Sequence, residues 1–216
     1  MLRQPLYVAA GVASLLVGVA RWGILGSSSS ELPQTLKATR IEAEPICPWR
    51  EPEPDLRTFF PEADAYDTET RILSGFRTEL AWRLGRTPTA GENTLRLYRV
   101  YRRPAPLGTI LTSRVKGEYG AIEIVLAVDI GNVIRGLRLQ RLREPEPIAT
   151  ALQQPGWLGA FQGTALNDLG RLERDLPPVP APARVSAEAV VDGIRGLLIR
   201  LDVAQQAGVP VARRHH

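Results

Sequence analysis

The sequence predicts an α+β domain in which helices flank an antiparallel sheet. Strand-like runs follow one another between residues 94 and 142. A helical pattern precedes them at residues 67–85, and a second pattern follows them at 184–201. Because helices bracket the strands, we expect one folded domain over residues 67–205, followed by a tail at 206–216.

Apolar spacing predicts the first helix. Leu73, Phe76, Leu80 and Leu84 recur at intervals of three or four residues within DTETRILSGFRTELAWRLG, residues 67–85. Asp67 or Thr68 supplies an N-terminal cap, and Gly85 follows the last apolar residue, as is typical of a helix end.

The strands are predicted at residues 94–102, 108–115 and 120–142. The last of these runs holds a hairpin, because apolar residues alternate along its first half and Gly131-Asn132 then supplies a turn. The alternating residues are Ile122, Ile124, Leu126 and Val128 against Ala121, Glu123, Val125 and Ala127, and the returning strand carries Val133, Leu137 and Leu139.

The C-terminal third reads as a second set of helices. Residues 149–163 predict a short helix and an apolar cluster of Trp157, Leu158 and Phe161. The polar stretch 164–176 is expected to be a loop or an irregular strand. A Pro-rich approach then leads into the closing helix, whose apolar face comprises Val190, Val191, Ile194, Leu197, Leu198 and Leu201.

Residues 1–26 predict a membrane anchor. The run from residue 4 to residue 25 reaches the roughly 20 apolar residues that span a bilayer if Arg21 snorkels and Trp22 lies at the interface. A secretory signal cleaved after Ala20 is the alternative. Either interpretation carries the domain across the inner membrane of a bacterium. We expect a cytoplasmic N-terminus, a single span and a periplasmic domain.

An arm at residues 27–66 follows, flexible at first and then acidic and Pro-rich. Residues 41–69 hold nine acids against two arginines, whereas residues 71–143 hold thirteen arginines and one lysine against five acids. One interpretation is that the arm folds back onto its own basic domain. The other is that it docks a neighbouring subunit through its aromatic residues, for which we expect Trp49, Phe59 and Phe60 to be the partner-binding anchors.

Several chemistries are excluded by composition. Cys47 is the single cysteine, and the two histidines, His215 and His216, end the chain. We therefore expect no metal site, no haem and no catalytic histidine. The basic residues do not form an aromatic-interleaved module, so nucleic acid is not an expected partner.

The order of motifs over residues 117–201 resembles the bacterial FMN-binding domain of RnfG/NqrC-type subunits of membrane electron-transfer complexes. The matching pieces are the strand GAIEIVLAVD, the strand GNVIRGLRLQ with Glu144 after its end, Phe161 with Gly163, and the run AVVDGI in the closing helix. The resemblance implies the fold, membrane attachment and an electron-transfer complex as partner.

The same resemblance places a phosphate loop at residues 180–186, where flavinylated members read Ser-Gly-Ala-Thr-x-Thr-Ser and carry FMN on the second Thr. Val185 stands at that position and has no hydroxyl, while two prolines remove backbone donors. Covalent FMN is therefore not expected. Arg184 and Ser186 remain as a residual anion site at a helix start, unless Ser186 merely caps the helix. Glu144 and Asp168 are expected to be solvated carboxylates rather than an acid/base pair.

These observations predict a non-catalytic, membrane-anchored accessory subunit of a bacterial electron-transfer or photosynthetic complex. Its partners would be the other subunits and, through residues 4–25, the lipid bilayer. The alternative is an electron-transfer flavoprotein that binds FMN non-covalently. A periplasmic solute-binding or sensory domain has no positive feature in the sequence.

Overall fold

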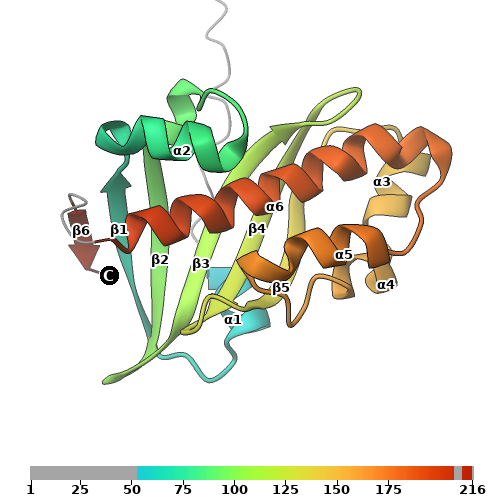
Figure 1. Ribbon diagram of the computed structural model, residues 1–216. Coiled ribbons are helices and arrows are strands. Elements are labelled where there is room, and N and C mark those ends of the chain that lie inside the picture. Colours follow the sequence, from blue (N-terminus) through green and yellow to red (C-terminus); the bar gives the residue numbers. More distant parts are fainter. Residues whose placement is uncertain (1–52, 207–210, 216) are drawn as a thin grey trace, which may run out of the picture. The chain divides into compact units, whose positions relative to one another are not determined.

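The computed structural model describes residues 53–206 and 211–215, which all belong to one compact unit, Pro48–His216. Its centre is a six-stranded sheet in the order β5-β4-β3-β2-β1-β6, with antiparallel neighbours throughout (Figure 1). The strands are β1 (Ala65–Ile72), β2 (Thr94–Arg102), β3 (Ala105–Lys116), β4 (Ala121–Asp129), β5 (Ile134–Leu142) and β6 (Val211–His215).

Helices lie on both faces of this sheet (Figure 1). They are α1 (Glu53–Phe59), α2 (Arg77–Leu84), α3 (Glu146–Leu152), α4 (Pro155–Gly159), α5 (Leu169–Asp175) and α6 (Arg184–Ala204). Short 3₁₀ turns occur at Ser74–Phe76, Ala90–Asn93, Leu166–Asp168 and Ala181–Ala183.

The main core lies between the sheet and the long helix α6, which crosses the strands (Figure 1). Ile194 and Leu197 on α6 are fully buried and belong to the same apolar cluster as Ile124 on β4. Gly193 makes this close packing possible, because a Cβ there would lie 2.5 Å from Val115 Cγ1 and 2.6 Å from Ile124 Cδ1.

A smaller core covers the opposite face of the sheet, where α1 packs. Phe60 is 1% exposed and clusters with Leu56, Val100 and Val125. Phe59 lies over Gly136 of β5, where a Cβ would come within 2.4 Å of the Phe59 ring. The segment around α1 is thus part of the folded domain.

The sequence-predicted α+β class and its antiparallel sheet with flanking helices are confirmed. The strand predicted at 94–102 is β2, and the predicted hairpin is β4 and β5. Its turn contains Asn132 at φ 62°, a left-handed conformation that asparagine tolerates. Trp157 and Phe161 pack edge to face with ring centroids 5.2 Å apart, within the predicted apolar cluster.

The helix predicted at 67–85 is correct only in its second half. Residues 65–72 form strand β1, which pairs with β2 from Ala65↔Tyr101 to Ile72↔Thr94. Tyr66, Thr68, Thr70 and Ile72 alternate along this strand and favour extended backbone, whereas the helical spacing begins only at Leu73. Gly85 ends α2 with φ 67°, as its position predicts.

Two further segments differ from the sequence-based prediction. Residues 169–175 form the helix α5 rather than a loop, because Leu169 and Leu172 reach the main core from one helix face. The predicted tail at 206–216 contains β6, which extends the sheet by pairing with β1 from Asp67↔His215 to Arg71↔Val211. An edge strand such as β6 is held mainly by backbone hydrogen bonds and needs no particular side-chain pattern. The sequence therefore gives no indication of β6.

The acidic segment folds back onto the basic domain over its described part, as the first of the two interpretations predicts. Asp55 pairs with Arg138 at 2.5 Å and Glu62 with Arg135 at 2.9 Å. Burial raises the pKa of Asp55 despite its bonds to Arg138. The expectation that Phe59 and Phe60 are anchors for a partner is therefore corrected, because the chain's own sheet buries Phe60 fully and Phe59 partly.

Trp49, the predicted anchor at residues 4–25 and most of the arm at 27–66 lie outside the described residues. Among residues 53–206 and 211–215, no helix is both long and apolar enough to cross a membrane.

Candidate functional site: a cation-lined cleft

The anion site predicted at the start of α6 is not formed. Arg184 is exposed, whereas Ser186 is 0% exposed and its Oγ accepts a hydrogen bond from the Glu118 backbone N–H at 3.0 Å. A 3₁₀ turn precedes the helix, so the N–H groups of Ala183 and Arg184 already donate to Pro180 and Ala181 carbonyls. Two of the backbone donors near the helix start are therefore already occupied. Ser186 ties the helix to the β3–β4 turn.

The two candidate carboxylates occupy separate parts of the fold. Glu144 accepts long hydrogen bonds of 3.3–3.4 Å from the backbone N–H groups of Tyr119 and Gly120, so it supports the β3–β4 turn. Asp168 ends the 3₁₀ turn before α5. Neither position gives an acid/base pair.

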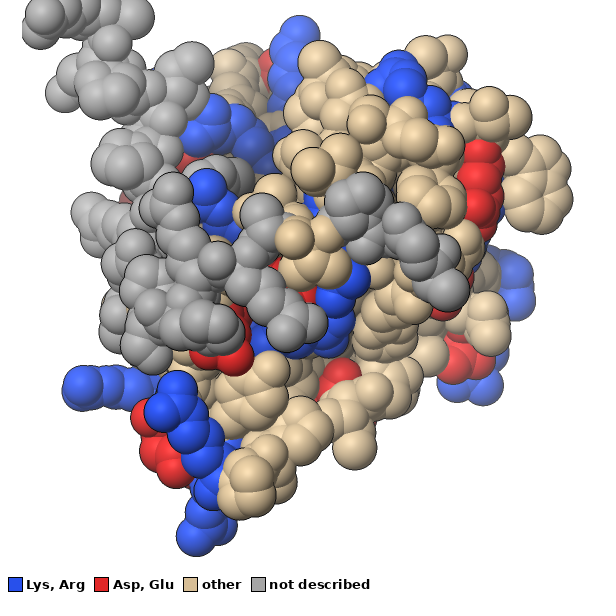
Figure 2. Space-filling model, turned by 90° about the vertical axis from the view of Figure 1, so that its left-hand side faces the viewer, with Lys and Arg blue, Asp and Glu red and all other residues tan. Residues whose placement is uncertain are grey.

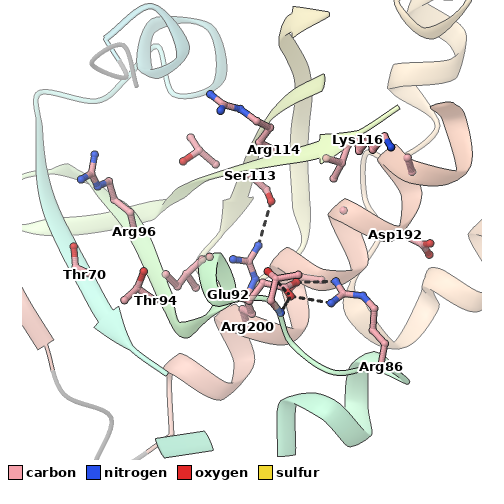
Figure 3. Close-up of a pocket in the computed structure, with 18 residues that line it drawn as sticks. Thr70, Arg86, Glu92, Thr94, Arg96, Ser113, Arg114, Lys116, Asp192 and Arg200 are labelled. Carbon is pink, nitrogen blue, oxygen red and sulfur yellow. Dashed lines mark hydrogen bonds and ion pairs between the residues drawn. The ribbon is translucent and has the colours of Figure 1, made fainter. Parts of the chain in front are cut away.

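A cleft of about 600 Å³ instead lies where β2 and β3 separate above α6 (Figure 3). We call it the strand cleft. Five basic side chains and two acidic ones line it, together with small and hydroxyl residues. The basic residues are Arg86, Arg96, Arg114, Lys116 and Arg200, and the acidic ones are Glu92 and Asp192.

Strand pairing explains why the cleft exists. The ladder between β2 and β3 runs from Arg102↔Ala105 to Leu97↔Leu111 and includes neither residues 94–96 nor residues 112–116. Both segments continue as strands, because residues 94–96 pair with β1 and residues 112–116 pair with β4. Helix α6 forms the floor, where Gly193 and Gly196 are among the lining residues and Gly193 lets the helix approach Val115 of β3 closely.

Glu92 is held at one wall by a dense set of donors. Arg86 donates to both of its carboxylate oxygens at 2.8 and 2.7 Å, and the Thr89 backbone N–H donates at 2.8 Å. Burial alone would raise the pKa of Glu92, but these hydrogen bonds outweigh it and lower the pKa to about 2. Glu92 is therefore a fixed negative charge whose hydrogen-bonding capacity is already used.

Arg200 is a buried cation on the floor of the cleft. It is 6% exposed, and it donates to neutral acceptors, the Gly196 carbonyl at 3.1 Å and the Ser113 hydroxyl at 3.3 Å (Figure 3). Burial lowers the pKa of Arg200, and the charge of Glu92 offsets this only in part. Within the described residues no carboxylate forms an ion pair with this guanidinium. A buried charge without a direct counter-ion is costly, so the floor of the cleft favours an anion.

The remaining cations differ in whether they are paired. Arg114 contacts Glu123 of β4 at 2.7 Å. Across residues 53–206 and 211–215, the Arg96 and Lys116 side chains have no ion pair or hydrogen bond, and both are exposed. Asp192 lies 3.9 Å from Arg195 in the middle of α6. In the described part of the chain, Arg96 and Lys116 therefore lack a carboxylate partner, and Arg200 has only the longer-range charge of Glu92 and no direct ion pair.

Basic side chains elsewhere are mixed with acidic ones. On the molecular face in Figure 2, blue and red side chains lie among one another rather than forming one basic field. Arg141, Arg143 and Arg184 likewise have no side-chain ion pair or hydrogen bond among the described residues, so the strand cleft is distinguished by gathering such cations around one hollow.

Sequence reasoning missed this site, although two signals for it are present. Thr89-Ala90-Gly91-Glu92 has the spacing of a capping box, which the structure forms. Arg200 interrupts the apolar face of the closing helix between Leu197 and Leu201. The sequences of β2 and β3 give no sign that the two strands separate, because β2 remains paired with β1 and β3 with β4 beyond that point.

The strand cleft is lined by side chains suited to binding an anion. Its hydroxyl side chains are accompanied by arginines and carboxylates but by no histidine or cysteine. In the described part of the chain no three Asp, Glu, His or Cys side chains gather as metal ligands. No known protein-family model matches this chain, and no curated protein is significantly similar to it.

Proposed function

We propose that this protein is a non-catalytic accessory subunit of a membrane electron-transfer or photosynthetic complex, and that it docks an acidic partner in the strand cleft. The observation that carries the docking role is that three cations around one cleft of about 600 Å³, Arg96, Lys116 and Arg200, form no ion pair with a carboxylate of the described residues. An acidic partner would neutralise all three.

Two features support a role without catalysis. The helix start that resembles a flavin phosphate loop has its hydroxyl buried at Ser186 and its first N–H groups bonded within the 3₁₀ turn. Of the two carboxylates in the cleft, Glu92 is engaged by Arg86 and Thr89, and the lining otherwise consists mainly of cations, hydroxyls and small residues. An FMN-binding-like fold without a flavin site would be suited to holding the subunits of a complex together.

The membrane setting rests on the sequence. The apolar run at residues 4–25 would hold the domain at the bilayer, and the resemblance over residues 117–201 suggests an electron-transfer complex. Tethering raises the local concentration of the partner, so each individual contact in the cleft can be weak.

The test is the size of the native complex in mild detergent. A tagged full-length chain is expressed in the source organism and analysed by native electrophoresis as wild type and as Arg96→Glu/Lys116→Glu. Both side chains are exposed, so charge reversal should leave the fold intact. We expect the reversed variant to leave the complex.

A matched control reverses two other exposed arginines, Arg171→Glu/Arg174→Glu on α5, which lie away from the cleft. This control should migrate with the complex like wild type. If both double variants behave alike, whether retained or released, the cleft is not the docking site.

A further inference from the structure

The strand cleft is bounded by two open strand edges. Residues 112–116 pair with β4, from Thr112↔Val125 to Lys116↔Ala121, but have no ladder partner on the β2 side among the described residues. Residues 94–96 pair with β1 and are likewise outside the β2–β3 ladder. Backbone groups at such edges are templates for pairing with a further strand.

Side chains beside these edges point alternately to the two faces of the sheet. Ser113 and Val115 face α6, since Ser113 contacts Arg200 and Val115 lies against Gly193. Arg114 and Lys116 therefore lie on the other face, where Arg114 meets Glu123. Arg96 is on that same outer face, because Leu95 and Leu97 belong to the core on the α6 side.

The unpaired cations are thus divided between two faces. Arg96 and Lys116 lie on the outer face, while Arg200 lies on the α6 side (Figure 3). A small anion in the cleft would neutralise one group and leave the other unpaired. An extended peptide presents side chains to both faces in turn, so it can neutralise both.

We infer that the strand cleft receives an extended acidic segment of the partner as an added strand along residues 112–116 of β3. Its main chain bonds to the open edge, carboxylates at alternate positions face Arg96 and Lys116, and a carboxylate on the opposite side reaches toward Arg200. This inference rests on the proposed docking function and specifies the partner's conformation and charge.

The test uses full-length protein in detergent and a fluorescein-labelled peptide of eight residues, Glu-Glu-Thr-Glu-Thr-Glu-Thr-Thr, called the alternating peptide. Three of its Glu residues face one side of an extended strand and the fourth faces the other side. Anisotropy should report binding that weakens at least tenfold in Arg96→Glu/Lys116→Glu and is unchanged in Arg171→Glu/Arg174→Glu. Binding should also slow amide hydrogen exchange at residues 112–116, which attraction between charges alone would not do.

Three controls separate strand addition from simpler attraction. A peptide of the same composition with its four Glu residues in one block should bind at least fivefold more weakly. The alternating peptide N-methylated at every second residue should lose binding, because methylation removes its backbone donors. Inorganic phosphate at a concentration equal in charge should not displace the alternating peptide.

Equal binding of the blocked or N-methylated peptide would overturn strand addition and leave electrostatic docking standing. Displacement by phosphate would likewise overturn it, in favour of a small-anion site. If no peptide binds while the native complex still depends on Arg96 and Lys116, the inference fails alone. If that dependence is also absent, the proposed function fails with it.

Discussion

The backbone N–H of Glu118 donates a hydrogen bond of 3.0 Å to the hydroxyl of Ser186, a residue 68 positions further along the chain. This bond joins the β3–β4 turn to the first turn of α6. The Ser186 hydroxyl, which the sequence resemblance would place beside a phosphate, thus accepts a hydrogen bond from within the fold. The start of α6 is therefore a structural junction, which is why we propose the strand cleft and not the helix start as the anion-binding region.

Replacing Ser186 should cost stability without changing ligand binding. Ser186→Ala removes the acceptor for the Glu118 N–H at a buried position, which costs about 1–2 kcal/mol. Urea unfolding of the full chain in detergent measures the loss. Val185→Ala at the neighbouring position, which is 52% exposed, is the control and should change stability little. An unchanged stability of Ser186→Ala would show that the junction contributes nothing.

The purified protein should carry no flavin. Val185 cannot form a phosphoester, and the N–H groups of Ala183 and Arg184 are bonded to the chain itself. Denaturing gels should show no flavin fluorescence at 23.7 kDa, and the native protein should lack absorbance near the usual flavin maxima. A fluorescent band would overturn the loss of covalent attachment. Absorbance without a band would favour the alternative of non-covalent FMN.

Truncating Phe60 should unfold the domain rather than merely release a partner. Its ring is 1% exposed against the sheet, so Phe60→Ala is expected to cost about 3–5 kcal/mol. Phe59→Ala should cost less, because Phe59 is only partly buried. Thermal unfolding of each variant gives the comparison. Wild-type stability in Phe60→Ala, combined with release from the native complex, would restore the assembly role for this residue.

The parts of the fold that sequence predicts well are those in which local pattern and tertiary position agree. The β4–β5 hairpin is one example, because a central strand with apolar residues on both faces is followed by a turn at Gly131-Asn132. β1 is the opposite case. Its Asp, Thr, Glu and Arg residues have no strong apolar pattern, and it is held as a strand by pairing with β2 on one side and β6 on the other.

The candidate site was harder to predict than the fold. Arg200 meets Ser113 across 87 positions, and Glu92 meets Arg86 only because a capping box turns the chain between them. Two of the predicted partner residues, Phe59 and Phe60, were misassigned for a related reason. Aromatic residues in a Pro-rich acidic segment resemble an interaction arm, whereas the structure uses Phe60 to cover the outer face of its own sheet.

Stability should fall at acidic pH through Glu92. Its pKa is about 2 in the folded protein against an ordinary value of 4.5, so its contribution is fully present above pH 4.5 and is lost as pH falls toward 2. The contribution is about 3 kcal/mol at pH 7 and falls to roughly half of that by pH 3. Urea unfolding of wild type and Glu92→Gln at several pH values isolates it.

The difference in unfolding free energy between these two proteins should shrink as pH falls. Arg171→Glu/Arg174→Glu, on the distant helix α5, serves as a charge control and should leave the pH dependence that Glu92 produces in place. A difference between wild type and Glu92→Gln that stays constant from pH 7 to pH 3 would contradict the assigned role of the Arg86–Glu92 pair.

Site-specific photocrosslinking in intact membranes tests the central claim most directly. A photoreactive amino acid at Lys116, on the outer rim of the strand cleft, should crosslink to one defined acidic segment of a membrane-complex subunit. The same amino acid at Arg171 should not give this product, and Arg96→Glu in the same chain should abolish it. Crosslinks from Lys116 that match those from Arg171, or that persist in the Arg96→Glu background, would contradict docking through the strand cleft.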